Sequence, residues 1–410
     1  MHSFFATSIS KRAHKATRGT GLWLILHLFG ELELVFAIWT VPFLVLWLIK
    51  NDLTSVFAYL SGLHFIEPVF VFCIMVVAAT KPILMVARQI IYRLGQVVAR
   101  LCRLPKVQAD ILVILVVGPL LGSLITEPAA MTVTGFLLVS VLGASHEKML
   151  HAALAVLFVN ISIGGALTHF AAPPILMVAG TWQWNFKYIF FHFGWKAVIA
   201  VIVNSVIFIT FYRNQILENC HKLEVLGKTV PVPLWVSVVH IFMLLLFVLN
   251  SSSLSLLSIL IVVFWGLVQI TKKYHEQLRV KESILVAVFL AGIVFFGGFQ
   301  SWWLQPLLQK MSEQQIYLST VFLTAIADNA ALTYLGAQVS DLSESAKYYL
   351  VAGAVAGGGL TIIANAPNAA GLSILQSKLL GRFSPLRLFV YALPPTIVAV
   401  LAFRYLPNLG

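Results

Sequence analysis

Long apolar runs recur from one end of the 410-residue chain to the other, and they limit its fold more than any other feature. In the hydrocarbon core of a bilayer, only α-helices and closed β-barrels satisfy all of their backbone hydrogen-bonding groups. The runs are continuous rather than alternating, so we expect helices. Hydrophobic residues make up 60% of the chain, charged residues only 10%, and the mean hydropathy is +0.94, which excludes a soluble protein. The sequence predicts an all-α polytopic membrane protein.

The apolar runs divide the chain into two similar halves. We expect membrane segments at 22–49, 67–90, 108–146, 149–180, 188–212, 234–250, 254–271, 283–304, 315–340, 346–377 and 386–406. Polar residues, Gly and Pro interrupt four of them, at 108–146, 149–180, 315–340 and 346–377. The predicted units are an N-terminal tail with two helices (1–107), a first repeat (108–212), a cytoplasmic linker (213–233), scaffold helices (234–314) and a second repeat (315–410).

The basic residues fix an orientation. If 108–146 and 315–340 each enter and leave on one side and the other segments cross once, 20 of the 27 Lys and Arg residues fall on the side of the N-terminus. Five fall on the opposite side, and Lys81 and Lys196 lie within apolar segments. By the positive-inside rule we expect a cytoplasmic N-terminus. The net charge of +12 therefore reports orientation, and we expect no nucleic-acid partner.

Two short motifs occur once in each half, in the same order. The stretch 126–132 (TEPAAMT) matches 327–333 (ADNAALT), and 164–168 (GGALT) matches 357–361 (GGGLT). Together they indicate a duplication. The predicted orientation opens one hairpin from the cytoplasm and the other from outside, so the copies are inverted. We expect an inverted repeat with two re-entrant hairpins, each with an acid at its tip, and two broken transmembrane helices interrupted by Gly and Pro.

These motifs resemble the ion transporter superfamily, which includes D-type sodium/proton antiporters and arsenite permeases, and most closely a family named putative sodium/proton antiporters. The matching residues are Asp328, Asn329, Asn160, Gly164, Gly165, Thr168, Pro173, Pro174, Gly357 to Thr361, and Asn365. The resemblance implies scaffold and transport domains, ion sites at hairpin tips and broken helices, a homodimer, and the bacterial inner (plasma) membrane. Relatives usually carry an Asp before the Pro pair, where this chain has Ala172, and place the Asn two residues later than Asn160.

Glu127 and Asp328 occupy matching repeat positions within apolar segments. An ionisable residue at that depth is costly and indicates function, because burial favours the protonated carboxyl, which can exchange its proton for a cation. In the alternative, both acids only hold the hairpins together through hydrogen bonds. The predicted ion- and proton-binding set adds oxygen donors that could equally serve helix packing. These are Asn329, Thr132, Thr333, Asn160, Thr168, Thr361, Asn365, Gly164 and Gly357.

A proton relay is conceivable at His169 and at Glu31 and Glu33, which share the first apolar segment with His27. The structural alternatives are a hydrogen-bonded His169 and acids at a polar membrane boundary. We expect no cofactor and no metal other than the transported cation, since Cys73, Cys102 and Cys220 form no ligand spacing.

The sequence favours a secondary active transporter that exchanges sodium or another monovalent cation for protons, and not an enzyme. An anion transporter for arsenite or a carboxylate is the main alternative, using half-helix N-termini as positive ends. An intramembrane serine hydrolase using Ser145 and His146 is a remote one, because adjacent residues on a helix do not face each other. The chain contains no G-x-x-x-x-G-K-[ST] motif, which argues against ATP-driven pumping.

Overall fold

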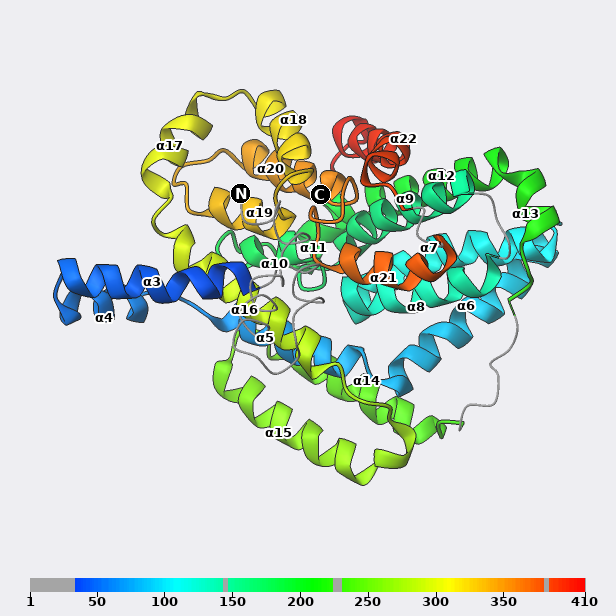
Figure 1. The fold of residues 1–410 in the computed structure, drawn as a ribbon, viewed down its shortest axis with the longest axis horizontal. Helices are drawn as coiled ribbons and strands as arrows, with labels where there is room; N and C mark the ends of the chain where they lie inside the picture. The colour runs from blue at the N-terminus through cyan, green and yellow to red at the C-terminus, as the bar shows by residue number, and fades with distance from the viewer. Residues whose placement is uncertain (1–33, 143–146, 224–230, 380–382, 410) are drawn as a thin grey trace, which may run out of the picture.

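The computed structural model of the protein describes residues 34–142, 147–223, 231–379 and 383–409, and within these ranges the chain folds into helices without strands (Figure 1). The first half contains α3 (Val35–Lys50), α4 (Leu53–Ser61), α5 (Ile66–Ala78), α6 (Lys81–Leu101), α7 (Lys106–Ile125), α8 (Glu127–Val141), α9 (Glu147–Gly164), η2 (Gly165–Leu167), α10 (Pro173–Ala179), α11 (Phe186–Ile189), the π-helical turn η3 (Phe190–Gly194), α12 (Trp195–Phe211) and α13 (Arg213–Asn219). The second half contains α14 (Leu234–Leu249), α15 (Leu254–Ile270), η4 (Lys272–Tyr274), α16 (Val280–Gly297), α17 (Ser301–Lys310), α18 (Glu313–Thr324), α19 (Asn329–Ala337), α20 (Glu344–Gly357), α21 (Pro367–Leu379) and α22 (Pro385–Tyr405).

Two of the expected single segments are each divided into two helices. The segment expected as one helix at 67–90 is divided: α5 ends at Ala78 and α6 begins at Lys81. The division occurs because Thr80 is extended and Pro82 occupies the first turn of α6, where its missing N–H costs nothing. The predicted segment at 283–304 likewise ends as α16 at Gly297, and α17 starts separately at Ser301.

The interruptions predicted within 108–146 and 149–180 are confirmed. Helices α7 and α8 form a hairpin whose two arms meet at the single residue Thr126. Thr126 has φ 69° and ψ 152°, a left-handed conformation that strains any residue other than glycine. Helix α9 ends at Gly164, and after η2 and an irregular stretch the chain resumes as α10 at Pro173. The first repeat therefore consists of a hairpin followed by a broken helix.

The second repeat has the same order of elements. Helices α18 and α19 form the hairpin, α20 ends at Gly357, and α21 resumes at Pro367 after an irregular stretch. Gly164 and Gly357 occupy corresponding positions and make corresponding contacts. A Cβ added at Gly164 would lie 2.7 Å from the Pro119 carbonyl oxygen, and a Cβ added at Gly357 would lie 2.7 Å from the Val321 carbonyl oxygen. Each broken helix thus approaches the first arm of its own hairpin at a point where only glycine fits.

The two repeats interlock. Helix α8 of the first hairpin packs on α21 of the second broken helix, and α19 of the second hairpin packs on α10 of the first. Reciprocal contacts of this kind are what a two-fold relation between two copies produces. The hairpin tips and the breaks of both repeats consequently meet at the centre of this group.

A second group of helices lies beside the repeats. Helix α5 packs against α16, α14 and α15, and α3 packs against α16. Figure 1 shows α14 and α15 along one edge of the molecule, away from α18, α20 and α22. These helices carry many exposed apolar side chains, as a lipid-facing surface does. Within the described ranges, five helices and one bent pair, α4 with α5, are long and apolar enough to cross a membrane.

Candidate ion-binding site

Glu127 is the first residue of α8 and is completely buried, with 0% of its surface exposed. It lies at the tip of the first hairpin, directly after the strained Thr126. Its Oε2 accepts a hydrogen bond of 2.6 Å from the Nδ2 of Asn365, which stands in the break of the second repeat. The carboxyl group of one repeat is therefore held by an amide of the other.

The charge of Glu127 is not compensated by a basic residue. Among the residues that the structure describes, no ion pair includes Glu127, and its Oε1 has no hydrogen-bond partner. A Cβ at Gly165 would lie 2.6 Å from Oε1, so only glycine leaves space beside this oxygen. A buried, unpaired carboxylate costs several kcal/mol, on the order of the penalty for any isolated ion, unless it binds a proton or a cation.

Asp328 is the N-cap of α19 at the tip of the second hairpin. Its Oδ1 accepts hydrogen bonds from the backbone N–H groups of Ala330 (2.9 Å) and Ala331 (3.1 Å). This is the usual capping geometry, in which a carboxylate satisfies the free donors of a first helical turn. Asp328 is half-buried and lies within electrostatic range of Glu127. The two matched acids thus differ in environment, although both stand at hairpin tips.

Three amide side chains with unpartnered oxygens lie in the break of the second repeat or directly after Asp328. The break of the second repeat carries Asn365 and Asn368, and the Nδ2 of Asn368 donates to the carbonyl oxygens of Gly358 (2.7 Å) and Thr361 (2.8 Å). The buried Asn329 follows Asp328, and its backbone N–H donates to the Ala364 carbonyl at 3.0 Å.

The side-chain Oδ1 atoms of Asn329, Asn365 and Asn368 have no partner within the described part of the chain. Together with Glu127 Oε1 they are four buried oxygens without a partner in the described ranges, and we call them the oxygen set. Oxygen is the ligand type that hard cations prefer.

Thr168 and Thr361 tie each broken helix to its own hairpin. Thr168 Oγ1 donates to the Ser123 carbonyl at 2.8 Å, and Thr361 Oγ1 donates to the Ala325 carbonyl at 2.9 Å. The carbonyl of Gly164 accepts from Ser123 Oγ at 2.7 Å, and the carbonyl of Gly357 accepts from the Leu360 N–H at 3.0 Å. These groups hold the breaks in shape, and the hydroxyl hydrogens of both threonines are used within the protein.

The structure does not bring Asn160 to the acids. Its amide bonds to the Leu115 carbonyl at 2.9 Å and to the side chains of Ser205 and Asn204 at 3.1 and 3.0 Å, between α7, α9 and α12. This network matches the helix-packing alternative for Asn160.

Other predicted residues lie apart from the carboxyl groups or beyond the described ranges. Thr132 Oγ1 donates to the Pro128 carbonyl at 2.9 Å, and Thr333 Oγ1 donates within α19. His169 is half-buried with its ring edge-on to Phe170, 5.5 Å between ring centres. The residues outside the described ranges are His27, Glu31, Glu33, Ser145 and His146.

Sequence reasoning missed Asn368 and Ser123. An Asn three residues beyond Asn365, at the start of an apolar half-helix, is the signal that could have identified Asn368. Ser123 offers no such signal, because a serine near the end of a membrane helix is common.

The sequence model of the family described as "Putative Na+/H+ antiporter" matches residues 1–406. The chain belongs to this family. A solved structure of the YdaH transporter from Alcanivorax borkumensis is similar over 98% of this chain and 95% of that one, with 15% sequence identity and a TM-score of 0.45. The comparison with curated proteins gives no match. The chain is an integral membrane protein of a transporter family.

Proposed function

We propose that this protein exchanges sodium, or another monovalent cation, for protons, with Glu127 as the central titrating group and Asp328 as the second. The observation that carries the proposal is a fully buried carboxyl group that has no basic partner among the described residues, placed where two helix breaks and two hairpin tips meet. Such a group is stable only when it holds a proton or a cation. Competition of the two ions for one carboxyl group couples their movement.

The residues around Glu127 have separate roles in this exchange. Asn365 donates to Oε2 and leaves Oε1 unpartnered, like the amide oxygens of Asn329, Asn365 and Asn368 that complete the oxygen set. A bound cation takes oxygens from that set, and a bound proton neutralises Glu127 instead. Asp328 adds negative charge nearby, which favours the cation over an anion.

The packing indicates which parts move together. Each hairpin is bound to its own break by Thr168 or Thr361, and the two repeats interlock through α8 with α21 and α19 with α10. We infer that the repeats move as one body, carrying the site past the group formed by α3, α5, α14, α15 and α16. Alternating access by rigid-body movement of one bundle against another is the general mode of secondary transporters.

The anion alternative is disfavoured by the same contacts. The N-terminal ends of α8 and α19 are positive helix ends at the hairpin tips, and each carries its own acid. Asp328 already occupies the free N–H groups that an anionic substrate would need. Two carboxyl groups at these ends repel an anion and attract a cation.

Reconstitution into liposomes containing a pH-sensitive dye tests the proposal. Adding sodium, lithium or potassium outside should move protons, whereas arsenite or citrate should not. Glu127→Gln and Asp328→Asn should each reduce exchange by about 100-fold or more, because an amide keeps the size and cannot titrate. Glu218→Gln, an exposed acid on α13, is the matched control and should exchange normally. Sodium-driven proton movement that survives both amide substitutions eliminates this site, and arsenite or citrate uptake without a cation response replaces the function.

The homodimer, the bacterial inner membrane and the cytoplasmic N-terminus stay predictions. We expect the dimer contact outside the hairpins and broken helices, where Trp235 of α14 and Trp265 of α15 are exposed. Native mass spectrometry from lipid nanodiscs should show two chains per particle, and a monomer counts against the prediction. Cysteines introduced at Lys106 and Lys148 should both react with a membrane-impermeant thiol reagent added from the cytoplasmic side.

A further inference from the structure

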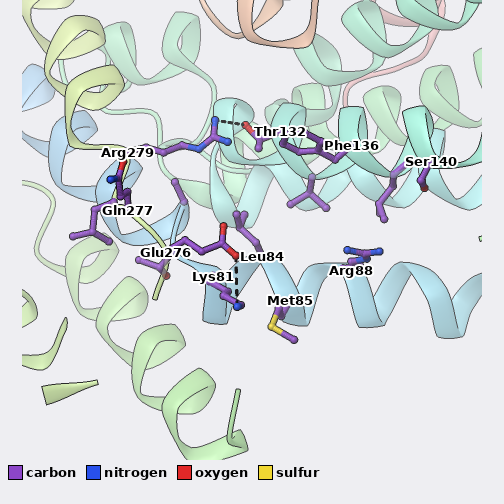
Figure 2. Close-up of a pocket in the computed structure, with 15 residues that line it drawn as sticks. Lys81, Leu84, Met85, Arg88, Thr132, Phe136, Ser140, Glu276, Gln277 and Arg279 are labelled. Carbon is purple, nitrogen blue, oxygen red and sulfur yellow. Dashed lines mark hydrogen bonds and ion pairs between the residues drawn. The ribbon is translucent and has the colours of Figure 1, made fainter. Parts of the chain in front are cut away.

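A cavity of about 400 Å³ opens between α6, α8 and the segment that joins η4 to α16, and it is separate from the oxygen set at Glu127 (Figure 2). Lys81 and Arg88 reach it from α6, and Arg279 reaches it from the residue before α16. In Figure 2 the side chain of Arg279 extends towards α8, where its Nη1 donates to Thr132 Oγ1 at 3.4 Å.

The charge of this cavity is positive. Lys81 forms an ion pair with Glu276 at 3.5 Å, so these two side chains cancel. Arg88 and Arg279 form no ion pair with any carboxylate in the described ranges. Two guanidinium groups remain uncompensated beside the hydroxyl groups of Thr132 and Ser140. A cavity with this balance repels a monovalent cation and attracts an anion, and arginine suits phosphate because its planar fork can donate two hydrogen bonds.

The remaining wall of the cavity is apolar. Leu84 and Met85 contribute from α6, and Val133, Phe136 and Leu137 contribute from α8. Phe136 is 54% exposed, whereas most of the other residues of α8 are buried. Exposed apolar surface next to a basic cluster matches a ligand that has a negative head and a hydrocarbon tail.

We propose that this cavity binds the phosphate head group of an anionic phospholipid, with Arg279 on the phosphate and the start of an acyl chain along Met85 and Phe136. Arg88 lies at the other end of the side chains drawn in Figure 2 and adds positive charge without contacting the phosphate. A soluble phosphate ester shares the head-group chemistry but gains nothing from the apolar wall, so the lipid is the occupant. Basic pockets between membrane helices commonly hold anionic head groups. The ligand lies against α8, the helix that begins at Glu127, and it contacts the arginine that holds Thr132.

Native mass spectrometry of the purified full-length protein in detergent tests the site, with phosphatidylglycerol and phosphatidylcholine added in turn. The wild-type protein should retain phosphatidylglycerol in preference to phosphatidylcholine. Arg279→Gln should weaken that retention by roughly fivefold, the effect expected for one basic residue near a lipid head group, and Arg88→Gln should weaken it less. Arg279→Lys keeps the charge and should retain most of the binding, which separates charge loss from misfolding.

Lys272→Gln is the matched control, because this exposed lysine belongs to the same connection and does not line the cavity. It should leave the preference for phosphatidylglycerol unchanged. Equal retention of the two lipids by the wild-type protein overturns the proposal, as does equal weakening by Lys272→Gln and Arg279→Gln. If millimolar glycerol phosphate alone displaces the lipid, the cavity binds a soluble phosphate ester instead, and this result also overturns the proposal.

Discussion

The first hairpin contains two completely buried acids, one near its base and one at its tip, and their surroundings are opposite. Asp110, in the first turns of α7, forms an ion pair with Lys106 and accepts a hydrogen bond from the Leu223 N–H at 3.0 Å. Glu127, at the start of α8, has a single amide partner and no cationic one in the described part of the chain.

Burial alone therefore does not make an acid functional. At the base of the hairpin the protein supplies its own cation, Lys106, and the carboxylate of Asp110 joins α7 to the segment around Leu223. At the tip the residues that the structure describes supply only an amide, and under the proposed function Glu127 takes its neutralising proton or cation from solution. We propose that the absence of a fixed countercharge is what distinguishes the exchange site at Glu127 from the structural acid Asp110.

The largest expected difference between the two acids is in stabilisation by sodium. A ligand that binds only the folded protein at 100 times its dissociation constant stabilises it by about 2.7 kcal/mol. We expect sodium, compared with choline at equal ionic strength, to raise the melting temperature of the wild-type protein. Glu127→Gln should lose this shift and Asp110→Asn should keep it. A shift that persists in Glu127→Gln places the cation elsewhere.

Removing the ion pair between Asp110 and Lys106 at the base of the hairpin should lower the free energy of unfolding. Asp110→Asn removes the carboxylate from Lys106 and weakens the bond to the Leu223 N–H, and should cost about 2 kcal/mol. Thermal unfolding in detergent measures the loss. The protein that remains folded should still exchange sodium for protons, and a loss of exchange in stable, monodisperse Asp110→Asn protein breaks the comparison.

The pH dependence of transport sharpens the comparison further. A proton on Glu127 blocks the cation, so raising the pH removes the competitor and lowers the apparent sodium KM, by up to about tenfold per pH unit while the group is mostly protonated. The KM should become constant once the carboxyl group is deprotonated. Asp110→Asn should show the same profile. Initial rates in liposomes at several pH values test this, and a KM independent of pH means that proton and cation do not share a site.

The smallest expected effect comes from the space beside Glu127. A Cβ at Gly165 would lie 2.6 Å from Oε1, so Gly165→Ala should displace the carboxyl group and raise the apparent sodium KM by about fivefold. Gly62→Ala is the control, because its added Cβ comes no closer than 3.4 Å to its neighbours. Sodium titrations at fixed pH compare the two variants, and equal KM values show that Oε1 does not contact the cation.

The family and the broad fold were predictable from sequence because they depend on local chemistry. Continuous apolar runs require membrane helices, and the paired motifs around Glu127 and Asp328 place an acid at each hairpin tip. The breaks at Gly164 and Gly357 follow from residues that end helices wherever they occur. The division of 67–90 at Thr80 was missed because a proline in an apolar run can either kink a helix or start one.

The sequence by itself determined that this is a duplicated helical membrane protein with two acids in matching, apolar positions. Only the tertiary structure decided which polar groups meet: Glu127 finds Asn365 across 238 residues, whereas Asn160 turns to α7 and α12. The physical reason is that the state of a buried charge depends on the groups around it. For Glu127 those groups come from distant segments, which no local pattern of the chain specifies.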